Sequence, residues 1–270
     1  RKPMKNQLGT DTIRNTGTGV SAVATDMHQA GYRALPNERD VTTLRNHQSN
    51  LKGGLDARTM DLQDNLKKTV KETILIPKNN MLTPQIVLDA YSKGLFPMAE
   101  NRRNKQLFWI DPEVRGILPL DNFHIPRSLK KKIRNKPFEV RFDHNFSAVI
   151  RACAQQNPKR LETWINDEII ELYTKLFCMR HAHSVECWQD EKLVGGLYGI
   201  SIGGAFFGES MFSTERDSSK IALVHLVARL NLAGFILLDT QFITDHLKQL
   251  GAIEIPRLEY HKILDSALNL

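Results

Sequence analysis

Hydrophobic positions in residues 76–270 recur with the spacing of strands in some segments and of helices in others. Three apolar runs in close succession predict a meander of strands, and a fourth run predicts a buried strand: Ser184–Trp188, Lys192–Ile202, Ala205–Phe212 and Phe235–Asp239. Apolar stripes bounded by capping or breaking residues predict helices: Pro84–Lys93, Arg127–Arg134, Asn166–Met179, Ile221–Leu232, Thr244–Leu250 and Arg257–Leu268. Short strands are predicted over Leu107–Asp111, Arg115–Pro119 and Phe138–Asp143. This order predicts an α+β fold, with helices packed on a sheet.

The first 75 residues have a different pattern. Of the 20 Phe, Trp and Tyr residues in the chain, only Tyr32 lies there, and aliphatic runs are few. Such a segment cannot bury enough apolar surface to offset the lost chain entropy. Residues 1–75 are therefore predicted to be a polar, disordered extension, with helix-forming residues over Asp56–Glu72.

Composition excludes several classes of protein. With 270 residues, 41% hydrophobic and 25% charged, the chain can bury a core and is neither collagen-like nor wholly disordered. Three cysteines without a C-x-x-C pair argue against a disulfide scaffold and fit a reducing compartment, so we expect a cytoplasmic protein. No run of 18 apolar residues occurs, and no signal-peptide pattern is visible, so no membrane association is expected.

The formal net charge of +7 is concentrated in one segment. Between His124 and Arg160 there are ten Lys or Arg residues and two acidic residues. Arg127, Lys130, Lys131 and Arg134 recur three or four positions apart, which places them along one face of a helix. Such a stripe can neutralise backbone phosphates of a nucleic acid, although most charge runs are simply solvated helix faces.

Two acidic positions stand out near apolar strand ends. Glu209 lies within the apolar strand Ala205–Phe212, where a carboxylate needs either a structural partner or a polar ligand. Asp239 and Gln241 are two positions apart, so strand alternation predicts that they share a face. A carboxylate and a carboxamide there could orient an amine and relay its proton, or could form a buried structural pair. Spacing leaves both interpretations open.

Other candidate patterns point to no cofactor. Gly195-Gly196 and Gly203-Gly204 do not form a dinucleotide-binding fingerprint, because no helix follows them directly. His181 and His183 lack a third ligand at recognisable spacing, so neither a metal nor an organic cofactor is expected.

Several strings occur in an order that resembles the bacterial leucyl/phenylalanyl-tRNA–protein transferases. The resemblance covers about residues 76–268 and is carried by Gly195–Gly199, Phe206–Ser213, Ser219-Lys220, Asp239–Gln241 and Asp245–Arg257. Earlier matches agree in order: Leu88–Pro97, Trp109 with Pro112, His124–Ser128, Thr163–Ile165 and Arg180–Trp188.

This resemblance implies a small N-terminal domain over residues 76–115 and a catalytic domain over 116–270. The catalytic domain would be GNAT-like, similar to acyl-CoA N-acyltransferases and FemABX transferases, with a mixed sheet flanked by helices. The implied reaction moves Leu or Phe, and in some cases Met, from aminoacyl-tRNA to proteins that begin with Arg or Lys, which feeds the N-end rule degradation pathway. The implied partners are the tRNA acceptor stem with its 3′ adenosine and the acceptor protein, bound by a monomer without a cofactor.

The resemblance also implies site roles. Gln241 would contact the acceptor amine, Asp239 would orient and polarise Gln241, and Glu209 would hold the aminoacyl-adenosine end. Trp164 would stack on the terminal adenine, and an apolar pocket would receive the donor side chain: Leu197, Phe206, Leu223, Leu226 and Leu238. The basic stripe Arg127, Lys130, Lys131 and Arg134 would bind the acceptor stem.

The sequence departs from the family pattern at a few positions. Met98 stands where many members have an aromatic residue that packs at the adenosine, so tRNA binding is expected to be weaker. Leu197 and Leu226 stand where many members have Met or Phe, so the donor preference is expected to shift. Two other functions stay open from sequence: another GNAT-fold N-acyltransferase that uses acyl-CoA or a peptidoglycan precursor, and a non-catalytic tRNA-binding protein. The first is disfavoured because no pyrophosphate-binding glycine loop precedes Ile221.

Overall fold

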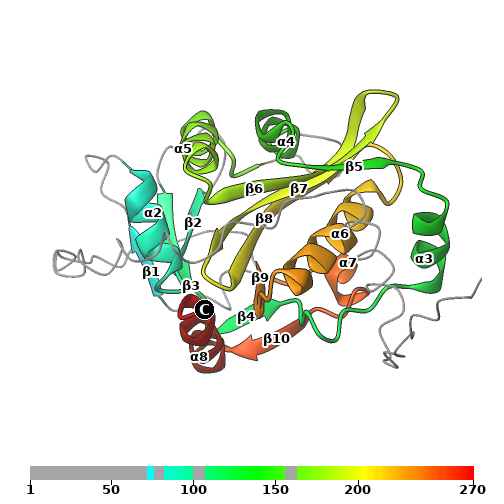
Figure 1. Ribbon diagram of the computed structural model, residues 1–270. Coiled ribbons are helices and arrows are strands. Elements are labelled where there is room, and N and C mark those ends of the chain that lie inside the picture. The colour runs from blue at the N-terminus through cyan, green and yellow to red at the C-terminus, as the bar shows by residue number, and fades with distance from the viewer. Residues whose placement is uncertain (1–71, 76–81, 100–106, 156–162) are drawn as a thin grey trace, which may run out of the picture.

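The computed structural model describes residues 72–75, 82–99, 107–155 and 163–270. Within these ranges, strands form a three-stranded sheet and a seven-stranded sheet. The first has the order β1-β3-β2, and the second has the order β10-β4-β9-β8-β7-β6-β5. Figure 1 shows the larger sheet with helices on both faces, which is the predicted mixed α+β architecture.

The small sheet is antiparallel and consists of β1 (Glu72–Leu75), β3 (Leu107–Asp111) and β2 (Phe96–Ala99). It is joined by α2 (Pro84–Tyr91), which begins at the predicted position because the Thr83 hydroxyl caps its first turn and proline follows. β1 lies inside the stretch 1–75 that was predicted to be disordered. Its four residues pair with β3, and that partner is not apparent from local sequence. The helix-forming stretch from residue 56 lies outside the described residues, apart from Glu72 in β1.

The centre of the large sheet is the predicted meander. β6 (Ala182–Gln189), β7 (Lys192–Ile202) and β8 (Ala205–Ser213) pair antiparallel in sequence order. β5 (Glu139–Phe142) extends it at one edge. On the other side, β9 (Leu237–Gln241) pairs parallel with β8, and β4 (Val114–Ile117) and β10 (Ile253–Pro256) follow antiparallel. The prediction missed β1, β2 and β10, which are strands of four residues with few alternations to recognise.

The two faces of the sheet carry separate hydrophobic cores. Helices α4 (Phe146–Cys153) and α5 (Asp167–Cys178) cover one face, where Tyr198 and Phe207 are fully buried. Helix α6 (Ser218–Leu232) covers the other face with α3 (Arg127–Arg134) and α7 (Asp245–Lys248), where Phe206 and Leu238 are buried. Helix α8 (Arg257–Leu268) ends the chain beside β4 and β10. None of the helices in the described ranges has the length and hydrophobicity needed to cross a membrane.

Candidate active site

A cavity of about 740 Å³ opens where β8 and β9 separate. The two parallel strands pair from Ala205/Leu237 to Phe207/Asp239, and β8 then continues to Ser213 without this neighbour. The two strand ends therefore contribute both walls of the cavity: Gly208, Glu209, Ser210 and Met211 from β8, and Leu238, Thr240 and Gln241 from β9. The mouth of a parallel pair at its carboxyl end is a common position for a ligand site.

One part of the cavity is apolar, as predicted. Leu197 of β7, Leu223 and Leu226 of α6, and Leu238 of β9 all line it. Phe206 does not. Its ring is fully buried behind the wall and packs so closely on Gly199 that a Cβ on that glycine would lie 2.5 Å from the ring. Four of the five predicted residues thus line one cavity, and Met211 and Leu247 are further lining residues that the prediction did not include.

Aromatic and sulfur side chains line another part. Trp164 and the β2 residues Phe96, Pro97 and Met98 face the same cavity, so the small sheet contributes to its wall. Trp164 is half-buried, which leaves part of its ring open to a ligand. Met98, the residue that departs from the family pattern, lines this part of the cavity.

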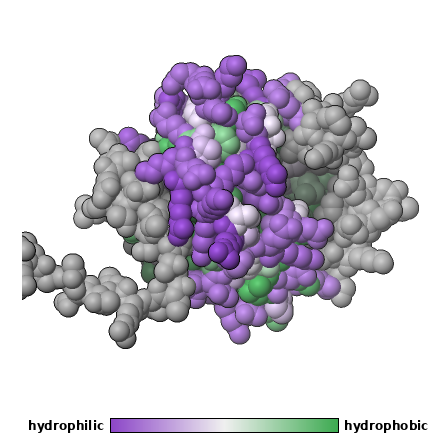
Figure 2. All heavy atoms as spheres, turned by 90° about the vertical axis from the view of Figure 1, so that its right-hand side faces the viewer, coloured by the Kyte–Doolittle hydropathy of each residue, from purple (hydrophilic) through white to green (hydrophobic). Residues whose placement is uncertain are grey.

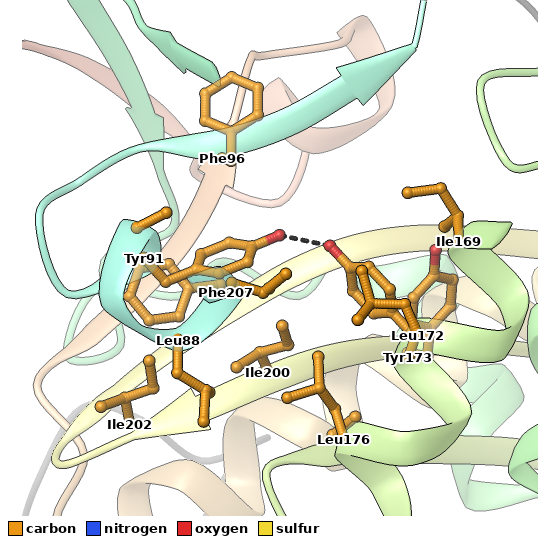
Figure 3. Close-up of a cluster of buried hydrophobic side chains, with 14 of the residues drawn as sticks. Leu88, Tyr91, Phe96, Ile169, Leu172, Tyr173, Leu176, Ile200, Ile202 and Phe207 are labelled. Carbon is orange, nitrogen blue, oxygen red and sulfur yellow. Dashed lines mark hydrogen bonds between the residues drawn. The ribbon is translucent and has the colours of Figure 1, made fainter. Parts of the chain in front are cut away.

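Glu209 is the extra residue of a β-bulge. The pairs Tyr198/Ser210 and Gly199/Gly208 leave it without a partner across the β7–β8 ladder, so the bulge redirects its side chain. Its carboxylate accepts a hydrogen bond of 2.6 Å from the Tyr91 hydroxyl and one of 3.4 Å from the Tyr173 hydroxyl. The two hydroxyls are themselves 2.6 Å apart, as the dashed line in Figure 3 marks.

The surroundings of Glu209 favour its protonated form. Desolvation by burial is the largest cause and raises the pKa of the carboxyl to about 8, with a further contribution from the nearby charge of Asp239. Hydrogen bonds from Tyr91 and Tyr173 and the charge of Arg115 oppose this shift. Burial and Glu209 together hold the pKa of Tyr91 well above its ordinary value, so this phenol stays a proton donor.

Asp239 is sealed beneath the cavity. Its side chain is fully buried and forms a salt bridge of 2.7 Å with the equally buried Arg115 of β4. The Arg115 Nε also donates to the carboxylate, and the Tyr260 hydroxyl of α8 donates to it at 2.8 Å. Burial disfavours the charge on Arg115, but Asp239 outweighs this and raises the pKa of the guanidinium.

Gln241 does line the cavity, but its relationship to Asp239 differs from the prediction. The backbone of Gln241 is left-handed, with φ of 57°, beside an irregularity in the β4–β9 pairing. Strand alternation therefore ends before this residue, and the two side chains do not share an exposed face. Gln241 is 8% exposed, and within the described residues its Nε2 has no hydrogen-bond partner.

Helix α3 presents the predicted basic stripe. Arg127, Lys131 and Arg134 are exposed, and Lys130 is partly exposed. Figure 2 looks onto this side of the molecule, where hydrophilic residues dominate the described surface. The helix lies against the start of α6 because Leu129 is buried in the same core and Lys132 forms a salt bridge of 3.2 Å with Asp217.

Polar contacts connect this helix to the cavity. Asp217 lies 3.8 Å from the ammonium of Lys220. His246 of α7 lines the cavity, and burial together with the charge of Lys220 lowers its pKa. Charged side chains at the N-terminus of α6 therefore interact both with the basic helix and with a residue that lines the cavity.

The described residues include no cluster of three or more His, Cys, Asp or Glu side chains that could hold a metal ion. His183, one of the two histidines considered as ligands, is instead bonded to Asp143 through Nδ1 at 2.8 Å.

Sequence reasoning missed four polar residues that build the site: Tyr91, Tyr173, Arg115 and Tyr260. The tyrosines belong to apolar helix faces, where a phenol resembles any large core residue. Arg115 begins a predicted strand, where a charged residue is expected to point to solvent. A signal in the sequence was that Arg115 and Asp239 have opposite charges and each lies on a short strand that contains apolar residues.

Comparisons with known proteins place the chain in a family. The family model of the leucyl/phenylalanyl-tRNA protein transferase matches residues 117–265, and the model of that family's N-terminal domain matches residues 80–113. A leucyl/phenylalanyl-tRNA–protein transferase of Phenylobacterium zucineum is 60% identical over 182 residues, which cover 67% of this chain and 82% of that protein. One of Paramagnetospirillum magneticum is 57% identical over 187 residues, which cover 69% of this chain and 90% of that protein. The chain therefore belongs to the leucyl/phenylalanyl-tRNA–protein transferase family.

Proposed function

We infer that this protein transfers Leu or Phe, and in some cases Met, from aminoacyl-tRNA to the α-amino group of proteins that begin with Arg or Lys. Family membership supports the reaction, and one observation of the site carries its assignment to this cavity. A single cavity is lined by an apolar group of leucines, an aromatic ring, a carboxyl group and a carboxamide. The product would be a protein marked for degradation by the N-end rule pathway, formed where charged tRNA is available, in the cytoplasm.

The apolar end suits the donor side chain. Leu197, Leu223, Leu226 and Leu238 offer hydrophobic contact without a polar partner, which fits Leu, Phe or Met and disfavours polar amino acids. Trp164 would stack on the terminal adenine, a contact worth about 1–3 kcal/mol. Glu209 lines the same cavity and would hold the aminoacyl-adenosine end.

The chemical step makes modest demands. An aminoacyl ester is already activated, so the protein needs chiefly to hold the acceptor amine against the ester carbonyl and to manage one proton. Gln241 is our candidate for the contact with the reacting groups, since its amide lacks another described partner. Asp239 would act on Gln241 through the backbone, since its carboxylate accepts the Gln241 N–H.

The exposed cations of α3 would bind the acceptor stem. Arg127, Lys130, Lys131 and Arg134 lie on one helix beside the start of α6, and phosphate contacts of this kind position a nucleic acid without reading its sequence. All of the cavity-lining groups come from one chain, so the proposal requires only a monomer.

We also propose that the large sheet is GNAT-like and that the chain divides into domains at residues 76–115 and 116–270. Support comes from the parallel β8–β9 pair that separates around the cavity, and from the separate small sheet. Tyr91 of the first domain bonds Glu209 of the second, so both would be needed for a complete site.

A direct assay tests the function. The protein is incubated with radiolabelled Leu-tRNA and peptides that are identical except for an N-terminal Arg, Lys or Gly. We expect label on the Arg and Lys peptides and none on the Gly peptide. Label on none of them, with acetyl-CoA serving as a donor in a parallel reaction, would favour the acyl-CoA transferase, and tRNA binding without any transfer would favour a non-catalytic binding protein.

A further inference from the structure

The attack of an amine on an ester requires a group that can take up a proton from the amine. The acceptor's α-amino group has an ordinary pKa of about 7.7–8.0, so much of it is protonated near neutral pH and cannot attack. The carboxamide of Gln241 does not titrate in this range and therefore cannot act as a base. Asp239 is fully buried, and its carboxylate is occupied by Arg115, Tyr260 and the backbone of Gln241. It therefore cannot reach a substrate.

Glu209 has both the position and the surroundings that a base needs. It lines the cavity together with Gln241 and Trp164, and the bulge in β8 leaves it outside the β7–β8 pairing. The hydroxyls of Tyr91 and Tyr173, which come from α2 and α5, hold its two carboxylate oxygens. With a pKa of about 8 it changes protonation near physiological pH, which is where general acid–base catalysis is most effective.

We propose that Glu209 is the general base of the transfer reaction and that Tyr91 and Tyr173 are its positioning residues. In this step the carboxylate takes a proton from the acceptor nitrogen as the nitrogen forms a bond with the ester carbonyl carbon. The bond between that carbon and the ribose oxygen of the tRNA then breaks, and protonated Glu209 returns the proton to the leaving oxygen. The products are the amide and free tRNA, and no oxidant, reductant or other reactant is consumed.

Gln241 has a complementary role in this scheme. Its Nε2 is a hydrogen-bond donor without a partner among the described residues, and it lines the cavity. A donor placed there stabilises the negative charge that develops on the carbonyl oxygen as the amine attacks. Gln241 thus donates to the substrate oxygen, and Glu209 accepts the proton.

The charges around Glu209 define how its pKa responds to substitution. The facing groups are Tyr91 of α2, Tyr173 of α5, Asp239 of β9 and Arg115 of β4. Tyr91 lowers the pKa of Glu209 through a hydrogen bond of 2.6 Å, whereas the Tyr173 bond is 3.4 Å and weaker. Loss of the Tyr91 hydroxyl should therefore raise the Glu209 pKa more than loss of the Tyr173 hydroxyl.

His246 is a rival base, because it also lines the cavity and its lowered pKa keeps it neutral at neutral pH. It lies on α7 beside Lys220 and Asp217, close to the proposed tRNA-binding helix, whereas Glu209 lies next to the bulge and the tyrosine pair. This location favours a role of His246 in binding tRNA. Substitution of each residue in turn shows which of them is the base.

The test rests on the proposed function and measures single-turnover transfer from Leu-tRNA to an Arg peptide across pH. The variants are Glu209→Gln, Tyr91→Phe, Tyr173→Phe and His246→Gln, each checked for folding by circular dichroism and for Leu-tRNA binding by filter retention. We expect Glu209→Gln to lower the transfer rate by about 100-fold or more, because general acid–base catalysis contributes about 10²–10⁴-fold. Its affinity for Leu-tRNA should fall much less than the transfer rate, because glutamine keeps the size of the side chain and a carbonyl oxygen.

The tyrosine variants give a readout that a merely structural role would not move. We expect the acidic limb of the pH–rate profile to shift to higher pH in Tyr91→Phe and by less in Tyr173→Phe. The acceptor amine is the same in all reactions, so a shift between variants belongs to the enzyme. Activity of Glu209→Gln close to wild type, an unshifted profile in Tyr91→Phe, or a comparable loss confined to His246→Gln would overturn the proposal. If the wild-type protein transferred nothing, the proposed function would fail as well.

Discussion

The carboxylate of Asp239 accepts a hydrogen bond of 2.8 Å from the backbone N–H of Gln241. The contact fixes the main chain of Gln241 at the point where the strand leaves its extended conformation, with φ of 57°. Arg115 and Tyr260 hold the other side of the same carboxylate. Asp239 therefore sets the position of Gln241 from below the cavity and does not share the cavity with it.

The first prediction concerns the buried Arg115. Its replacement in Arg115→Met leaves the Asp239 carboxylate buried without its cation. Removing one partner of a buried ion pair costs about 3–5 kcal/mol, so the free energy of unfolding in urea should fall by that amount. The double variant Arg115→Met/Asp239→Asn should recover part of the loss, because the unpaired charge is gone.

Arg141 provides the matched control for this experiment. It pairs with the carboxylates of Glu139 and Glu191, whose side chains are 60% and 80% exposed. Exposed pairs contribute about 0–1 kcal/mol, so Arg141→Met should change stability by no more than that. Equal losses in the two arginine variants would contradict the assignment of Arg115 as the buried anchor of the site.

The second prediction separates the backbone of Gln241 from its side chain. Glycine adopts a left-handed backbone without strain, whereas alanine there costs about 1–2 kcal/mol. Gln241→Gly should therefore be more stable than Gln241→Ala by about 1 kcal/mol in urea denaturation, although both variants should lose peptide transfer. If the glycine variant kept transfer activity, the carboxamide would have no part in the reaction.

The helices and strands that were predicted correctly are those whose local sequence carries a clear pattern. The β7 strand Lys192–Ile202 and the α8 helix Arg257–Leu268 match the predicted ranges, because long periodic segments carry a strong signal. Helix α6 begins one turn earlier than predicted, since Ser218 is buried and bonds the Val194 carbonyl. That partner lies far away in the sequence and gives no local signal.

The family resemblance, and not the local pattern, named the residues of the site. The four leucines that it implied line the cavity: Leu197, Leu223, Leu226 and Leu238. The bulge at Glu209 and the left-handed backbone at Gln241 depend on how neighbouring strands pair. Neither position is a glycine, so the sequence does not indicate an unusual backbone there. The roles of these residues in transfer stay predictions that the experiments above address.

The third prediction is a pH dependence of stability due to Glu209. The carboxyl has an ordinary pKa of 4.5 and a folded-state pKa of about 8. Between these values the folded protein binds more protons than the unfolded chain, so the free energy of unfolding falls as pH rises through this window. Glu209→Gln has no such titration. Urea denaturation at about pH 5 and about pH 8.5 should therefore show a smaller loss in this variant than in wild type.

Glu171→Gln is the control for that measurement. Glu171 is exposed on α5, and its bond to Lys175 lowers its pKa, so it stays ionised across the same window. This variant should keep the wild-type pH dependence. Parallel curves for wild type and Glu209→Gln would show that the Glu209 pKa is not raised, and the case for a base at this position would lose its electrostatic support.

The last prediction concerns the basic face of α3. Lys131 and Arg134 are exposed there, and Lys262 is an exposed lysine on α8, at the opposite side of the molecule in Figure 1. Each phosphate contact contributes about one unit to the slope of log affinity against log salt, because bound cations release counterions from the nucleic acid. The double variant Lys131→Ala/Arg134→Ala should bind Leu-tRNA more weakly and reduce that slope by about 2, whereas Lys262→Ala should leave both quantities unchanged. Filter binding at several salt concentrations measures them. An effect of Lys262→Ala half as large as that of the double variant would mean that tRNA responds to net charge alone, and α3 would not be its binding surface.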